Sequence, residues 1–317
     1  MGLDPSELSV EQIRARWVES GQPVTSHLLN RLKRDRRRGV RRIYEHLRRR
    51  HEREREEALR LDAMLNFERV LWRSGIRRVA GVDEAGTGPL AGPVVAAAVV
   101  FAPDTRIDGV DDSKRLEPER RTELAARIRE VARGVGVGVA DVEEIDRLNI
   151  YHAALLAMRR AVEALPEAPE HVLVDARAVP GVSVPQNCFQ KGDGINFSIA
   201  AASIVAKTHR DALLDDLDRR HPGYGLARHK GYATAQHCRA IRELGPSPVH
   251  RRSFTVIQEL RGEYSPRFYD LRRTLDAVAS ASELQLLEKE LEGSRETLAL
   301  VEQRKLRLLV ARRWKAL

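Results

Sequence analysis

Apolar residues between about residue 77 and residue 260 recur in two patterns that predict alternating strands and helices. Short apolar runs at residues 79–82, 94–101, 134–142, 171–175 and 182–190 are typical of buried strands. Apolar positions recur at helical spacing in residues 118–131, 143–165 and 198–219, and the last segment is apolar around most of its first half. This order predicts an α/β domain, in which helices cover both faces of a mixed sheet.

The segment before residue 75 has a different pattern. Ser9 and Gln12 form a capping box that predicts the start of a short helix, which Gly21-Gln22-Pro23 ends. The next stretch carries a broken apolar stripe and many basic residues, which are Arg31, Lys33, Arg34, Arg36, Arg37, Arg38, Arg41, Arg42, Arg48, Arg49 and Arg50. We expect a basic amphipathic helix or helix pair, which is either a clamp on nucleic acid or only a solvated face. Residues 51–72 continue a surface helix that connects it to the α/β domain.

Leucines return at helical spacing after residue 260, among many charges. This pattern predicts two helices folded as a hairpin, or one longer helix that self-associates. The tail is either an arm that binds a protein partner, itself or a duplex, or an accessory cover. The chain is therefore divided into residues 1–75, 76–260 and 261–317.

Composition narrows the class of partner. The 317 residues carry a net charge of +9, which favours polyanions, and nucleic acid above others. Cys188 and Cys238 stand far apart without a CxxC spacing, so neither a disulfide framework nor a zinc site is predicted. This cysteine usage fits a reduced cytoplasm. We also expect a soluble protein, since no signal sequence and no run of about 20 apolar residues occurs.

Carboxylates stand at the ends of several predicted elements. Asp83 and Glu84 follow the first apolar run and precede a cluster of glycines and prolines, Asp175 ends another run, and Asp193 lies in a turn before the apolar helix. Neighbouring residues of a strand point to opposite faces, so Asp83 and Glu84 share one metal only if the strand ends or bulges there. Such acids predict a site for Mg²⁺ or Mn²⁺, and two such ions support phosphodiester hydrolysis. A lone aspartate at a strand end has the plainer use of forming a turn.

The segment Gly81-Val-Asp-Glu-Ala-Gly-Thr-Gly-Pro-Leu-Ala-Gly-Pro93 resembles the signature of the type 2 ribonucleases H, specifically bacterial ribonuclease HII. Further blocks appear in the order of that family, and the resemblance extends from about Arg77 to Leu260. These blocks include Asp112-Ser113-Lys114, Lys191-Gly192-Asp193, Ala200 to Asp211, His229 to Thr234 and His250 to Phe254.

The resemblance implies a ribonuclease H-like sheet and an endonuclease that hydrolyses the RNA strand of RNA–DNA hybrids. It also implies incision 5′ of ribonucleotides embedded in duplex DNA, leaving a 3′-hydroxyl and a 5′-phosphate. By the same resemblance the catalytic, metal-binding acids are Asp83, Glu84, Asp175 and Asp193. The implied substrate contacts are the backbone of Gly86, Thr87 and Gly88 at the 2′-hydroxyl, Tyr232 on the ribose, and Lys114, Lys207, Arg210 and Lys230 at phosphates.

Thr87 departs from the family pattern, because bacterial ribonuclease HII usually has arginine there. Loss of that charge removes a phosphate contact worth roughly 1.5–3 kcal/mol. The related ribonuclease HIII often has threonine or lysine in this turn and prefers long hybrids, but it uses glutamate where this chain has Asp193, and its N-terminal extension contains a sheet. We therefore expect a ribonuclease HII with an altered substrate balance. The remaining hypothesis is a catalytically silent nucleic-acid-binding protein, against which the presence of all four acids argues.

Overall fold

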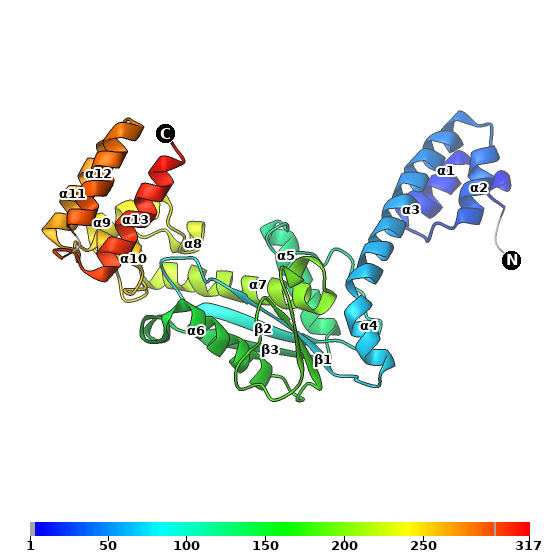
Figure 1. Cartoon of the computed structure of the whole chain (residues 1–317). Helices are drawn as coiled ribbons and strands as arrows, with labels where there is room; N and C mark the ends of the chain where they lie inside the picture. The colour runs from blue at the N-terminus through cyan, green and yellow to red at the C-terminus, as the bar shows by residue number, and fades with distance from the viewer. Residues whose placement is uncertain (1–3, 295) are drawn as a thin grey trace.

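The computed structural model describes residues 4–294 and 296–317 (Figure 1). At its centre lies a five-stranded sheet in the order β3-β2-β1-β4-β5. Its strands are β1 (Val79–Ala85), β2 (Val94–Val100), β3 (Gly134–Ala140), β4 (His171–Asp175) and β5 (Gln186–Phe189). β2 runs antiparallel to both β1 and β3, whereas β1, β4 and β5 are parallel. The predicted mixed sheet is thus confirmed, with its last strand shorter than expected.

Helices cover both faces of this sheet, as predicted. α7 (Phe197–Arg220) and α5 (Pro118–Val131) lie on one face, and α6 (Val142–Glu163) lies on the other (Figure 1). α7 approaches β1 so closely that a Cβ at Gly81 would lie 2.1 Å from the carbonyl carbon of Ser198. Glycine at this position therefore lets the start of α7 reach the centre of the sheet.

The N-terminal helices form a separate small core. α1 (Val10–Arg14) begins with the predicted capping box at Ser9, and a π-helical turn follows at Ala15–Glu19. α2 (Ser26–Arg34) packs against the first half of α3 (Arg38–Met64), so the basic stretch is a helix pair. The apolar residues between these helices are Ile13, Trp17, Val24, Leu28, Leu29, Leu32, Val40, Ile43 and Leu47.

The second half of α3 and the next helix, α4 (Asn66–Arg73), belong to a different core. Leu61, Met64, Leu65 and Trp72 are buried together with α7 and with the face of the sheet that α7 covers. Residue 75, where the composition changes, is therefore not a boundary in packing.

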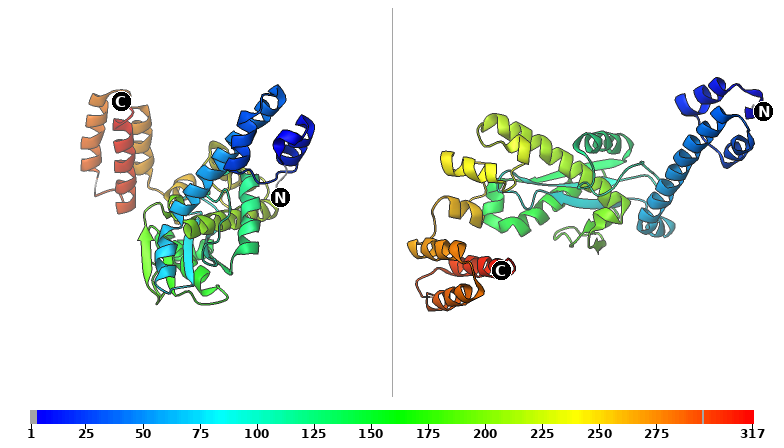
Figure 2. Two further views of the ribbon diagram at one scale, coloured as in Figure 1. Left: turned by 90° about the vertical axis from the view of Figure 1, so that its right-hand side faces the viewer. Right: turned by 90° about the horizontal axis from the view of Figure 1, so that it is seen from above.

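The last part of the chain departs from the expected hairpin or single long helix. After α8 (Leu226–His229), α9 (Ala235–Leu244) and α10 (Thr255–Leu260) come α11 (Pro266–Ala277), α12 (Ala281–Gly293) and α13 (Leu300–Trp314), which pack together around their own core. Ser265 and Ser280 cap the first two of these helices and interrupt the apolar period. Figures 1 and 2 place this unit and the N-terminal helices at opposite ends of the sheet domain. Within the described residues, no helix has the length and apolar character needed to cross a membrane.

Candidate active site

Asp83 and Glu84 both lie within β1, where they pair with Ala97 and Ala96 of β2. The end or bulge of the strand that was expected at these two residues is absent, because pairing with β2 keeps β1 regular as far as Ala85 and the glycines come only after it. Asp83 is buried on the face that α7 covers and accepts a hydrogen bond from Ser203. Glu84, the next residue, points to the opposite face.

Asp175 and Asp193 come from the neighbouring strand and the turn before α7. Asp175 ends β4, which is parallel to β1, and its Oδ1 accepts a hydrogen bond of 2.7 Å from the backbone N–H of Gly192. Asp193 is 5% exposed in the single 3₁₀ turn Gly192–Gly194, and its Oδ2 lies 3.2 Å from Nζ of Lys114. The fold thus brings the acids to the carboxyl ends of two adjacent strands, where ligand sites of α/β sheets gather.

Mutual repulsion marks these carboxylates as a group. Burial, followed by the charges of Glu84 and Asp175, raises the pKa of Asp83 well above its ordinary value. Burial and the charge of Asp175 raise the pKa of Glu84 to about 6. Burial raises the pKa of Asp175 too, against the opposing hydrogen bond from Gly192.

These residues suit a hard divalent cation in donor type and in charge. Carboxylate oxygens are the ligands that Mg²⁺ and Mn²⁺ prefer, and a bound cation would offset the burial and the repulsion that together raise the pKa values of Asp83, Glu84 and Asp175. Among residues 4–294 and 296–317, no three acidic, histidine or cysteine side chains already surround a point where an ion could sit. Lys114 provides positive charge instead: although burial opposes its charge, Asp193 and Asp112 hold the pKa of its ammonium above the ordinary value.

Two buried arginines fix the glycine-rich loop that follows β1, residues 86–93. The guanidinium of Arg251 donates to the carbonyl oxygens of Gly86 (2.6 Å), Thr87 (3.2 Å) and Gly92 (2.9 Å). Burial and the nearby charge of Arg210 lower the pKa of Arg251 to about 9, so Arg251 stays protonated at neutral pH. The sequence analysis included Arg251 in the block from His250 to Phe254 but assigned it no role.

Arg210 does not occupy the position expected of a phosphate contact. It is fully buried on α7 and donates to the carbonyl oxygens of Pro93 (3.0 Å), Ala91 (3.1 Å) and Lys230 (3.1 Å). Gly86, at φ +96°, is the residue that makes room for it, since a Cβ there would lie 2.0 Å from Nε of Arg210. Arg210 therefore supports the loop from beneath and leaves no donor at the surface.

The loop presents Thr87 and Gly88 to solvent, beside Tyr232. A Cβ at Gly88 would lie 3.8 Å from Cε1 of Tyr232, whose side chain is 47% exposed. The turn that carries Tyr232 is joined to the loop by a hydrogen bond of 2.8 Å from the N–H of Leu90 to the carbonyl of Gly231. Residues predicted to recognise ribose thus lie together.

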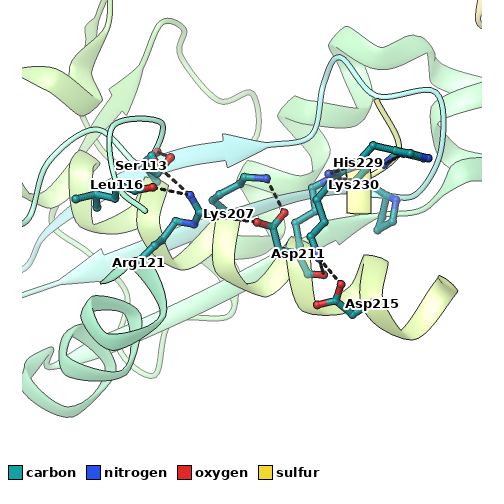
Figure 3. Close-up of polar contacts among 12 residues, drawn as sticks. Ser113, Leu116, Arg121, Lys207, Asp211, Asp215, His229 and Lys230 are labelled. Carbon is teal, nitrogen blue, oxygen red and sulfur yellow. Dashed lines mark hydrogen bonds and ion pairs between the residues drawn. The ribbon is translucent and has the colours of Figure 1, made fainter. Parts of the chain in front are cut away.

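The predicted phosphate-binding lysines differ in how free they are. Figure 3 shows Lys207 and Lys230 bound along one side of α7, where Nζ of Lys207 lies 2.5 Å from Asp211 and Lys230 pairs with Asp215. Asp211 also pairs with Arg121 at 3.1 Å. Lys114 has a side chain that is 78% exposed, so it is the readiest of the three to meet a phosphate.

A pocket of about 320 Å³ opens beside Glu84 on the face that α6 covers. Its walls include Thr87, Tyr151, Asp175 and Arg177. The guanidinium carbon of Arg177 lies 4.6 Å from the ring centre of Tyr151 and places a positive charge near Thr87. Sequence reasoning left Tyr151 unassigned and did not find Arg177.

Comparison with known proteins identifies the family of this chain. Residues 80–257 match the family model described as Ribonuclease HII, and residues 9–72 match that of the Ribonuclease HII N-terminal domain. The chain is 51% identical to a protein named Ribonuclease HII of Myxococcus xanthus, over 81% of this chain and 88% of that protein. It is 49% identical to the Ribonuclease HII of Geobacillus thermodenitrificans, over 74% of this chain and 90% of that protein.

A solved structure supports the assignment of the fold. The ribonuclease H2 of Pyrococcus horikoshii superposes with a TM-score of 0.52 at 25% identity, over 59% of this chain and 98% of that one. The N-terminal extension has its own family match, over residues 9–72. The chain belongs to the ribonuclease HII family and is a ribonuclease H enzyme.

Proposed function

We propose that this enzyme hydrolyses the RNA strand of RNA–DNA hybrids, and that it incises 5′ of single ribonucleotides in duplex DNA, with Mg²⁺ or Mn²⁺ as cofactor. The observation that carries this proposal is the repelling group of acids beside an exposed glycine turn. We expect this cleavage to leave a 3′-hydroxyl on one product and a 5′-phosphate on the other.

Asp83, Glu84, Asp175 and Asp193 would hold the ions. Bound there, two divalent ions supply an activated water and stabilisation of the leaving oxygen. The chain's own contribution is to order these acids and to oppose the rise in their pKa values, through Ser203 on Asp83 and the N–H of Gly192 on Asp175. Lys114 balances their charge from the side of Asp193.

Ribose recognition is assigned to the turn at Gly86, Thr87 and Gly88. Arg251 engages the carbonyls of Gly86 and Thr87 from the protein side, and this fixes the turn before substrate arrives. A 2′-hydroxyl both donates and accepts, so a rigid backbone can distinguish it from a deoxyribose carbon. Tyr232 stands beside Gly88 and would pack on the sugar.

Phosphates of the duplex would meet Lys114 first, and Lys207 and Lys230 once they leave their aspartates. We assign a further phosphate contact to Arg177, which lines the same pocket as Thr87 and partly replaces the arginine that the family usually has at position 87. Arg210 is left out of this set because its guanidinium is buried.

The basic face of α3 is proposed as a second contact on nucleic acid. Its arginines lie on the side of the helix away from Val40, Ile43 and Leu47, and they are Arg38, Arg41, Arg42, Arg49 and Arg53. Glu45, Glu52 and Glu56 share this face, so the positive charge is densest toward the start of α3. Such a surface binds phosphates without reading bases.

The test is cleavage of a labelled duplex that carries one ribonucleotide, with Mn²⁺ and then with excess chelator. We expect a metal-dependent cut on the 5′ side of the ribonucleotide, and loss of at least a thousandfold in rate for Asp83→Asn. Binding without any cut would instead identify a catalytically silent nucleic-acid-binding protein.

Substrate balance is tested at position 87. Thr87→Arg should raise the rate on the single-ribonucleotide duplex relative to that on a long hybrid, because it restores a charge-assisted phosphate contact. Equal ratios for the two proteins would refute the role given to this position. A wild-type preference for the long hybrid would match the ribonuclease HIII-like alternative.

A further inference from the structure

Glu68 is a buried carboxylate contributed by α4, at the end of the N-terminal extension. Its side chain is 0% exposed and lies on the face of α4 that meets the sheet domain. Oε1 accepts a hydrogen bond of 2.9 Å from the backbone N–H of Ser198, and Oε2 accepts one of 3.2 Å from Nδ2 of Asn196. Burying a carboxylate costs free energy unless it is hydrogen-bonded, and these two bonds offset that cost. What the buried carboxylate does at this place therefore requires an explanation.

The partners of Glu68 stand at the N-terminal end of α7. Asn196 is the N-cap of this helix and accepts a hydrogen bond of 3.1 Å from the N–H of Ile199, while Glu68 receives the N–H of Ser198. Two donors of the first turn are therefore satisfied, one of them by a residue 130 positions earlier in the chain. A negative group at this end of a helix is also favoured by the helix dipole.

Hydrogen bonds continue from there to the catalytic acids. The N–H of Asn196 donates to the carbonyl of Gly192 at 2.8 Å, and the N–H of Gly192 donates to Oδ1 of Asp175 at 2.7 Å. Asp193 directly follows Gly192 in the same turn. An unbroken path thus runs from Glu68 through Asn196 and Gly192 to Asp175.

A second contact from α4 holds the other side of this turn. The rings of Phe67 and Phe189 have centroids 4.4 Å apart, and Phe189 ends β5 just before the turn. α4 therefore contacts the segment that carries Asp193 both before and after that residue.

We propose that Glu68 is a positioning residue for the metal-binding acids Asp175 and Asp193, supplied to the site by the N-terminal extension. The inference rests on the proposed function, in which these acids hold divalent ions. Without its bonds to Asn196 and Ser198, the turn at residues 192–196 loses its anchor and the acids lose their fixed spacing. Residues that orient metal ligands through hydrogen bonds typically change metal affinity by 10–100-fold when mutated.

Glu68→Gln in the full chain is the first test. The amide keeps the size of the side chain but replaces one acceptor oxygen with a donor that faces Asn196 or Ser198. Mn²⁺ binding, followed by electron paramagnetic resonance on enzyme without nucleic acid, should weaken about tenfold. In cleavage assays kcat should fall at fixed Mn²⁺, and KM for the hybrid should stay within twofold. Unchanged Mn²⁺ affinity would overturn the inference.

Asn196→Ser provides a milder variant in case Glu68→Gln does not fold. Serine still caps α7, but it is too short to reach Glu68 as asparagine does. Mn²⁺ affinity should fall about threefold, whereas a purely structural role would lower the melting temperature and leave the affinity unchanged. Glu19→Gln, an exposed site in the same extension, is the matched control and should behave as wild type.

The same measurements distinguish failure of the proposed function from failure of the role given to Glu68. If wild-type protein binds no Mn²⁺, or if Asp83→Asn binds it as tightly as wild type, the four acids are not the metal site and the role of Glu68 falls with it. If wild type binds Mn²⁺ through these acids and Glu68→Gln binds it equally well, only the role of Glu68 is wrong.

Discussion

The N-terminal and C-terminal helical regions both extend from the sheet domain, at opposite ends, but they are joined to it in different ways (Figure 1). The N-terminal region ends inside the domain: Leu65 and Trp72 share a core with α7, and Glu68 accepts a hydrogen bond from the first turn of that helix. The C-terminal helices bury their apolar residues among themselves. Their polar contacts with the domain centre on Glu259, which meets Lys305 at 3.4 Å and receives a hydrogen bond of 3.1 Å from Tyr269 at its carbonyl.

A region can therefore differ from the sheet domain in composition and still be part of its hydrophobic core. The basic, arginine-rich character of residues 31–50 suggests an addition to the enzyme, yet α3, which carries residues 38–50 of this stretch, contributes Leu61 and Met64 to the core of the sheet domain. The C-terminal region is also rich in charged residues at helical spacing, but it packs around a core of its own. Whether that unit binds a protein or a second copy of the chain stays a prediction.

Truncation should expose the contrast most strongly. A chain that begins at Ile76 loses Leu61, Met64, Leu65 and Trp72 from the core, and each is worth about 2–5 kcal/mol against a total stability of about 5–15 kcal/mol. We expect it to be unfolded by circular dichroism. A chain that ends at Gly262 should keep the cooperative melting and the hybrid cleavage of the sheet domain. Equal damage from both truncations would contradict the distinction.

Single leucines offer a matched test without truncation. Leu65 and Leu284 are 1% and 0% exposed, in the shared core and in the C-terminal core respectively. Leu65→Ala should lower the free energy of unfolding of the sheet domain by about 2–5 kcal/mol. Leu284→Ala should destabilise the C-terminal helices by a similar amount and leave the temperature dependence of cleavage unchanged. Calorimetry and activity measured after heating distinguish the two results.

The pH dependence of stability offers a further test of this comparison, because the repelling acids lie in the sheet domain and not in the C-terminal helices. The pKa of Glu84 is about 6 in the folded protein against an ordinary 4.5, so the folded state binds its proton more tightly. The corresponding stability is present below pH 4.5 and is lost as the pH rises through about 6, a loss of about 2 kcal/mol.

Glu84→Gln removes this loss. In chelator at pH 7 the variant should be more stable than wild type by about 2 kcal/mol, and the difference should vanish below pH 4.5. Mn²⁺ should stabilise wild type and have little effect on the variant. Denaturant unfolding at several pH values measures both, and a constant difference across pH would show that Glu84 is not under electrostatic strain.

Sequence patterns predicted the sheet and its covering helices because these depend on local periodicity. Contiguous motifs singled out the four acids, whose role as metal ligands stays a prediction. Burial decided what they missed. Arg210 occupies the position of a family phosphate contact, but only the fold shows that its guanidinium lies beneath the glycine loop. The bonds of Arg251 to that loop join residues more than 150 positions apart, so no local pattern contained them.

Glu68 did leave a signal. Met64, Leu65, Glu68 and Trp72 follow helical spacing, which puts a glutamate on an otherwise apolar face. A charged residue on such a face needs hydrogen-bond donors, but the sequence could not tell that Asn196 and Ser198 supply them. The positions of the C-terminal turns were similarly hidden, since leucine spacing alone does not show where a helix stops.

Removing positive charge from the N-terminal or the C-terminal helices gives the smallest expected effect, which is on affinity for the hybrid. Arg41→Gln with Arg42→Gln removes two exposed arginines from the basic face of α3, and hybrid affinity at moderate salt should fall roughly threefold to tenfold. The slope of log affinity against log salt should become shallower by about 2, because two phosphates are no longer neutralised. Arg304→Gln with Arg312→Gln makes the same charge change on exposed positions of α13 and should alter neither quantity. If the α13 pair weakens binding as much as the α3 pair, net charge alone explains the effect and the proposed contact of α3 with nucleic acid is wrong.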